Sequence, residues 1–70
     1  MKMSASEVMA AAKKFLQEDA GFSGVRILSV VAIEPDSKWK VLATVEGSPT
    51  NKKALIADDK DGQIVSYTDA

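Results

Sequence analysis

Residues that are able to bind a metal ion gather near the C-terminal end of the chain. The stretch ALIADDKDGQIVSY places three aspartates before a glycine, with apolar residues on both sides. A calcium-binding EF-hand loop has oxygen ligands at its positions 1, 3 and 5, glycine at position 6 and glutamate at position 12. With Gly62 as position 6, Asp59 and Asp61 fit positions 3 and 5, but Ala57 and Thr68 occupy positions 1 and 12. The EF-hand pattern therefore fails at both ends.

The same stretch matches the turn of a β-hairpin. Lys60, Asp61 and Gly62 suit a type I turn in which the glycine supplies the left-handed residue of a three-residue hairpin. Aspartates are favoured in such turns because their side chains cap neighbouring backbone N–H groups. We therefore predict a hairpin turn with no specific metal site, no cofactor and at most a weak, millimolar association with cations.

Residues that carry catalysis are scarce elsewhere. The chain has no histidine and no cysteine, so it lacks the commonest general base and the best nucleophile. The carboxylate pairs Glu34–Asp36 and Asp58–Asp59 fall at the ends of expected strands, where side chains are normally solvated. No serine stands in a recognisable arrangement with a base. We predict no catalytic residues and no enzymatic activity.

Length and charge narrow the classes of function further. The 70 residues are enough for one small domain, residues 1–70. Nine basic residues nearly balance ten acidic ones, which disfavours a nucleic-acid platform. No stretch approaches the roughly 20 apolar residues of a membrane span, and the N-terminus has no apolar leader region. We expect a cytoplasmic protein that does not associate with membranes.

Two alternatives to a protein-binding function remain open. One is a small ligand- or cation-binding domain built around the acidic turn. The other is a weak binder of single-stranded nucleic acid, in which cations meet on one sheet face beside a stacking ring. The cations would be Arg26, Lys40, Lys52 and Lys53, and the ring Tyr67 or Trp39. The opposing interpretation places Trp39 in the core and uses the lysines to protect strand edges.

The N-terminal segment predicts a helix over about residues 5–20. Ser4 and Glu7 fit the capping box that begins a helix. Gly21 suits the left-handed position that ends one. Apolar residues recur between these signals at helical spacing and form one face. They are Val8, Ala11, Ala12, Phe15 and Leu16.

The rest of the chain predicts four strands with short connections. We expect them at residues 25–34, 38–46, 52–58 and 63–68. The second strand alternates clearly, with Trp39 on the apolar face that would form the core. The element order predicts an α+β fold, in which one N-terminal helix packs on a four-stranded antiparallel meander sheet (α-β-β-β-β).

The first expected strand carries apolar residues on both of its faces. One helix covers only one face of a sheet, so the second apolar set needs a partner protein or a second copy to cover it. The residues of this candidate interface are Leu28, Val30, Ala32 and Leu42. The alternative is a β-bulge near Ser29, which would switch the register and point both Ile27 and Val30 inward.

Two short motifs resemble known families. The residues WKV and DDKDGQIVSY resemble the gas-vesicle accessory protein O (GvpO) family, which has a Trp-x-Val strand and a closing strand of the form D-x-D-G-x-hydrophobic-x-x-Tyr. The matching positions are Trp39, Val41, Asp59, Asp61, Gly62, Ile64 and Tyr67. The arrangement is also similar to PepSY-type domains, small helix-plus-sheet modules that act through protein contacts. Both resemblances imply a non-catalytic interaction or accessory module, and the first implies a role in gas-vesicle assembly.

Overall fold

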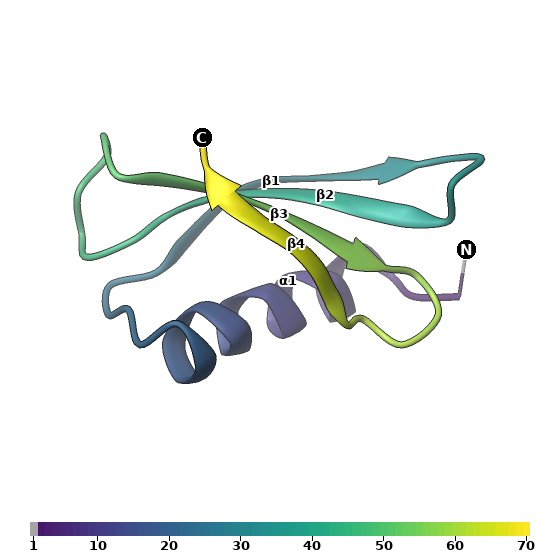
Figure 1. The fold of residues 1–70 in the computed structure, drawn as a ribbon, viewed down its shortest axis with the longest axis horizontal. Helices are drawn as coiled ribbons and strands as arrows, with labels where there is room; N and C mark the ends of the chain where they lie inside the picture. The colour runs from purple at the N-terminus through teal and green to yellow at the C-terminus, as the bar shows by residue number, and fades with distance from the viewer. Residues whose placement is uncertain (1) are drawn as a thin grey trace.

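One helix lies across one face of a four-stranded sheet, and the other face of the sheet is uncovered (Figure 1). The computed structural model describes residues 2–70. The strands follow in the order β1-β2-β3-β4 with every neighbouring pair antiparallel, so the predicted α+β meander is confirmed. The elements are α1 (Ala5–Lys14), η1 (Phe15–Asp19), β1 (Arg26–Ile33), β2 (Lys38–Thr44), β3 (Lys52–Asp58) and β4 (Ile64–Asp69).

The helix begins at the capping box that the sequence predicts. The Glu7 backbone N–H donates to the Ser4 side-chain oxygen at 3.2 Å, and the Ser4 N–H donates to a Glu7 carboxylate oxygen at 2.9 Å. Two N–H groups that have no partner inside the helix are thereby satisfied. This local signal fixes where α1 starts relative to the strands.

The helix ends one residue earlier than predicted and in a wider turn. Gly21 has a φ of +77°, which confirms the left-handed residue after the helix. The Phe22 N–H donates to the Leu16 carbonyl at 2.8 Å, a bond typical of a glycine-terminated helix. The last turn, η1, is π-helical, because the Ala20 N–H donates to the Phe15 carbonyl five residues back, at 3.0 Å.

The core lies between the helix and the sheet. Trp39 is 8% exposed and belongs to this core, as predicted. The buried apolar face of the helix is the predicted one, with Ala11 and Phe15 half-buried at its margin. The buried apolar residues are Val8, Ala12, Leu16, Trp39, Val41, Ala43, Val45, Leu55 and Ala57.

A β-bulge interrupts the edge strand β1. Ile27 pairs with Ala43 but Ser29 pairs with Leu42, so Leu28 is an extra residue on β1. Side chains alternate between faces in a regular strand, and the extra residue shifts this alternation by one. Ile27 and Val30 therefore both face the helix and pack against the core, which confirms the bulge alternative.

Candidate functional site

The acidic stretch forms the hairpin loop between β3 and β4. The Asp58 N–H donates to the Gln63 carbonyl at 2.9 Å, and the Gly62 N–H donates to the Asp58 carbonyl at 2.8 Å. Gly62 has a φ of +76°, the left-handed conformation expected of it. The hairpin is confirmed, but the prediction of a three-residue turn is wrong. Asp58 and Gln63 close the loop, so Asp59 belongs to it as well.

The carboxylates of Asp58, at the end of β3, and Asp61, in the loop, bind groups of the protein itself. Asp58 accepts the Lys60 backbone N–H at 2.9 Å, and its other oxygen lies 3.6 Å from the Lys38 ammonium nitrogen. Asp61 accepts the Gln63 N–H at 3.0 Å. Such bonds are how aspartates stabilise turns. Over residues 2–70, no group of three or more histidine, cysteine, aspartate or glutamate side chains is arranged to hold a metal ion.

We expect calcium to bind this loop only weakly. In a titration followed by amide NMR, the Asp59, Asp61 and Gly62 resonances should move without saturating below about millimolar calcium, the range of the weakest protein calcium sites. The physical reason is that an entering ion must displace the Lys60 and Gln63 N–H groups. A magnesium titration is the control. Saturation at micromolar calcium, with no response to magnesium, would establish a specific site and overturn this expectation.

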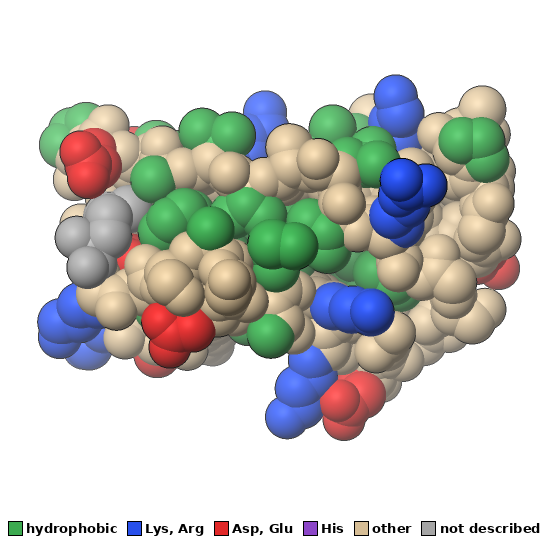
Figure 2. All heavy atoms as spheres, turned by 180° about the vertical axis from the view of Figure 1, so that it is seen from behind, with side chains coloured by type: hydrophobic (Ala, Val, Ile, Leu, Met, Phe, Trp, Pro, Cys, Tyr) green, Lys and Arg blue, Asp and Glu red, His purple; other side chains and the backbone are tan. Residues whose placement is uncertain are grey.

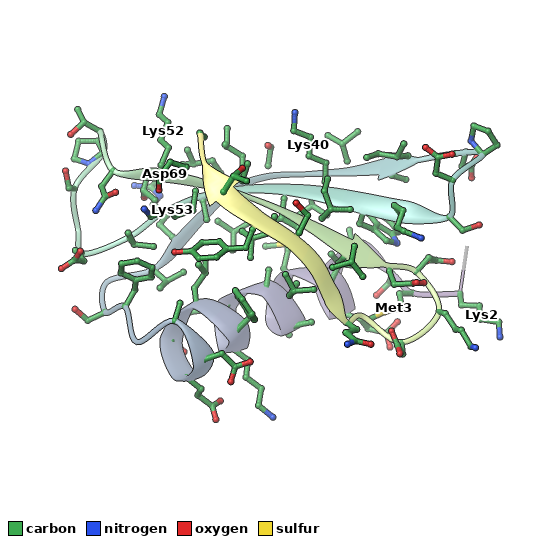
Figure 3. All side chains as sticks on the ribbon, in the orientation of Figure 1. Lys2, Met3, Lys40, Lys52, Lys53 and Asp69 are labelled. Atoms are coloured by element: carbon green, nitrogen blue, oxygen red, sulfur yellow. The ribbon has the colours of Figure 1, made fainter. Side chains whose placement is uncertain are left out.

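Asp59 is the buried carboxylate whose structural role the sequence does not reveal. It is 5% exposed, and its carboxylate accepts the Trp39 indole N–H at 2.7 Å, the Lys2 backbone N–H at 2.6 Å and the Met3 backbone N–H at 3.1 Å. Lys2 and Met3 lie beside the β3–β4 loop, so Asp59 ties the start of the chain to the hairpin (Figure 3). One signal pointed to such a partner: a buried tryptophan normally finds an acceptor for its N–H.

Hydrogen bonds lower the pKa of both adjacent aspartates, Asp58 and Asp59. The Trp39 indole N–H, followed by the Lys2 backbone N–H, lowers the pKa of Asp59 below its ordinary value, against the opposing effect of burial. The Lys60 backbone N–H, with the charge of Lys38, lowers the pKa of Asp58. Both carboxyl groups are therefore ionised at neutral pH and carry no proton to donate. Through these hydrogen bonds the pair stabilises the hairpin.

The uncovered face of the sheet carries apolar side chains surrounded by lysines. Pairing across the strands places five apolar residues on this face, and we call them the open-face patch. They are Val31, Ile33, Leu42, Ala54 and Ile56. Arg26, Lys38, Lys40 and Lys52 share this face, and among the described strand residues Asp58 is the carboxylate on it. Figure 3 shows Lys40 and Lys52 pointing away from the helix.

The four residues of the predicted interface, Leu28, Val30, Ala32 and Leu42, do not lie together on one face of the sheet. Leu42 lies half-buried on the open face, and Leu28 is 45% exposed in the bulge. The prediction that Val30 and Ala32 lie on the open face is wrong, because the bulge turns both toward the face that carries the core. Val31 and Ile33 take their place on the open face, and Val31 is 55% exposed. The predicted apolar surface exists, but with a different membership on β1.

The cations proposed for nucleic-acid binding do not all lie on one face. Lys40 and Lys52 lie on the open face, and Arg26 is placed there too because it pairs with Thr44, the partner of Lys52. Lys53 lies on the opposite side, in an ion pair with Asp69 (Figure 3). The structure therefore brings three of the four cations of the hypothesis to one face.

The two candidate stacking rings are placed away from the open-face lysines. Trp39 is buried in the core. Tyr67 packs edge-on against Phe15 under the sheet, with ring centroids 5.5 Å apart and an interplanar angle of 70°. Base stacking needs a free ring face beside a cationic groove, and neither ring provides it on the open face.

Comparison of the chain with protein-family models, with curated proteins and with solved structures gave no match. Within the described residues, neither α1 nor η1 has the length and hydropathy to cross a lipid bilayer.

Proposed function

We propose that this chain is a non-catalytic protein-interaction module that binds a partner protein on the open face of its sheet. The observation that supports the proposal is the open-face patch itself. Val31 is 55% exposed, and Leu42, Ala54 and Ile56 lie beside it with no element covering them. An apolar centre with a charged rim is the usual composition of a protein–protein interface.

The charges on this face favour a different protein over a second copy as the partner. Among the described strand residues, three lysines and Arg26 share the face with one carboxylate, Asp58, which already pairs with Lys38 at 3.6 Å. Two such faces packed together would bring lysines against lysines, and like charges at an interface cost several kcal/mol. A partner surface with apolar residues inside a rim of carboxylates would complement this face in both its charge and its apolar centre.

The resemblance to the gas-vesicle accessory protein O family suggests one setting for this activity, an accessory contact during gas-vesicle assembly. The resemblance to PepSY-type domains agrees with protein contact as the mode of action. Both rest on the motifs WKV and DDKDGQIVSY, whose residues form β2 and the β3–β4 hairpin. In either setting the open-face patch is the surface that we assign to the partner.

Leu42→Lys is the substitution that tests this proposal. Leu42 is half-buried near the middle of the patch, so a lysine there should weaken partner binding at least about tenfold. The free energy of unfolding should change by no more than about 1 kcal/mol, because the side chain points away from the core. The measurement is affinity capture from the native source with the immobilised chain, followed by titration of each captured protein.

Gln17→Lys is the matched control, because it adds the same charge to an exposed position of the helix. A true partner should bind the wild-type chain and Gln17→Lys equally and should be lost with Leu42→Lys. It should also bind more weakly as salt increases, since the rim contacts are ionic. Equal recovery of the same proteins on all three chains would contradict the proposal.

A further inference from the structure

A lysine stands at the centre of the open-face patch. Lys40 pairs across the sheet with Val31 on β1 and with Ile56 on β3. The other three residues of the patch are its next neighbours on the same face, two positions along β2 or on the diagonal: Leu42, Ile33 and Ala54. Directly opposed residues lie about 5 Å apart and diagonal ones about 7–8 Å apart. All five apolar residues therefore border Lys40.

Lys40 forms no ion pair within residues 2–70. Two positions away on β2, Lys38 lies directly opposite Asp58, and its ammonium nitrogen is 3.6 Å from a carboxylate oxygen. The other oxygen of Asp58 accepts the Lys60 backbone N–H. Lys40 is exposed and points away from the helix (Figure 3). The charge of Lys38 is thus balanced inside the chain, whereas the charge of Lys40 is not.

We infer that the protein partner of the open face places a carboxylate opposite Lys40, inside its own apolar contact surface. This inference rests on the proposed function and names the chemistry of the partner. A protein that covers the five apolar residues also removes water from the ammonium group at their centre, and a buried charge without a partner is strongly destabilising. Moving the ammonium group aside would lay it over Val31 or Ile56, which the partner also covers. Lys40 is therefore the residue that distinguishes an acidic partner from a neutral one.

The shape of the face favours a protein over a lipid surface or a nucleic acid. The open face forms the upper margin of Figure 2, where lysine and arginine side chains stand higher than the hydrophobic side chains between them. Insertion into a lipid surface requires apolar side chains that reach past the cations, but Leu42 and Ile56 are half-buried in the sheet. Base stacking requires a free ring, and neither Trp39 nor Tyr67 offers one on this face.

The footprint of the patch suits a short segment of the partner. The five residues lie on β1, β2 and β3, while β4 presents the polar Ser66 and Thr68 to this face. Three adjacent strands span about 10 Å, which is the width of a single helix. A peptide of about 16 residues forms a helix about 24 Å long, which is enough to cross the patch.

Peptide selection tests the inference with a defined probe. Random peptides of about 16 residues, displayed on phage, are selected on the immobilised wild-type chain, and those that also bind Leu42→Lys are discarded. The remaining peptides depend on the open face, and they should share an acidic residue flanked by apolar residues. The same selection on Lys40→Glu should replace that acidic residue with lysine or arginine, because opposite charges then meet at the centre of the patch.

Titration of a selected peptide, followed by fluorescence anisotropy, measures the effect of Lys40 on affinity. Lys40→Met keeps an unbranched stem and removes the charge, so the Kd should rise at least about tenfold. Lys38→Met is the matched control on the same strand. Its charge is already balanced by Asp58, so the Kd should change by less than about threefold. Circular dichroism of each variant shows that the fold is retained.

Failure of the inference and failure of the proposed function give different results. A lysine that only keeps the face soluble would let Lys40→Met bind the peptides as tightly as the wild type or more tightly. That result, or a set of Leu42-dependent peptides without a shared acidic residue, would overturn the inference and leave the proposed function standing. If every selected peptide binds Leu42→Lys as well as the wild type, the open face is not the binding surface and both are wrong.

Two further probes test the choice of a protein as the occupant. They are single-stranded oligothymidylate and vesicles that contain phosphatidylserine. Neither should bind the chain as tightly as the selected peptides do. Tighter binding of either probe than of the peptides, with loss of that binding in Lys40→Met, would overturn the inference, because Lys40 would then contact phosphate groups.

Discussion

Replacing Trp39 with alanine is expected to remove about 3–5 kcal/mol from the free energy of unfolding. Trp39 is 8% exposed and belongs to the core between the helix and the sheet, so its removal leaves a cavity. It also leaves the buried Asp59 carboxylate without the indole N–H. A domain of this length has a total stability of about 4–10 kcal/mol. Urea unfolding followed by circular dichroism should show a chain that is largely unfolded in water or close to it.

Trp39→Phe divides this loss into its two causes. Phenylalanine retains most of the buried ring but has no N–H to donate to Asp59. We expect it to be clearly more stable than Trp39→Ala and less stable than the wild type. An unfolding curve for Trp39→Ala that matches the wild type would contradict the assignment of Trp39 to the core.

The second large effect concerns acid stability, which Asp59 is expected to control. The hydrogen bonds from Trp39 and the Lys2 backbone lower the pKa of Asp59 in the folded protein. An unfolded aspartate has a pKa of about 3.9, so in acid the unfolded chain binds this proton first. The stabilisation from Asp59 is therefore complete above about pH 4 and is lost as the pH falls through the lower folded-state pKa. The free energy of unfolding should decrease in that window.

Asp59→Asn tests this assignment through a pH series of urea unfolding curves. The variant should be less stable than the wild type at neutral pH, and the difference should shrink as the pH falls below about 4. Some acid sensitivity should persist in the variant, because Asp58 also has a lowered pKa. Asp36→Asn, which removes an exposed carboxyl group in the β1–β2 turn, is the control and should follow the wild-type curve. A stability difference between Asp59→Asn and the wild type that is constant from neutral to acidic pH would contradict the role given to Asp59.

The features that local sequence determines were predicted correctly. The capping box of Ser4 and Glu7, the left-handed Gly21 and the hairpin at Gly62 each involve residues within a few positions of one another. The alternation of apolar and polar residues along β2 was enough to place Trp39 and Val41 in the core. The meander follows from the short connections between strands, since these favour antiparallel neighbours. These features need no information about which distant residues meet.

The face on which β1 places its side chains was decided by tertiary structure. Leu28 became the extra residue of a bulge, so Val30 and Ala32 turned toward the helix and Val31 toward the open face. The sequence RILSVVAI allowed either a regular strand or a bulge near Ser29, because apolar residues lie on both sides of that serine. The bulge is defined by pairing with β2, where Ala43 and Leu42 are the partners. One extra residue was enough to change the membership of the candidate interface.

The role of Asp59 was decided in the same way. Its chain position is that of an ordinary turn aspartate, and by sequence alone it belonged with Asp58 and Asp61 as a turn residue or a weak cation ligand. Its partners are 20 residues away at Trp39 and 57 residues away at Lys2. The sequence by itself thus determined the elements, their order and the core face of β2. Only the tertiary structure decided which apolar side chains stay uncovered and which carboxylate is buried, because both depend on contacts between residues far apart in the chain.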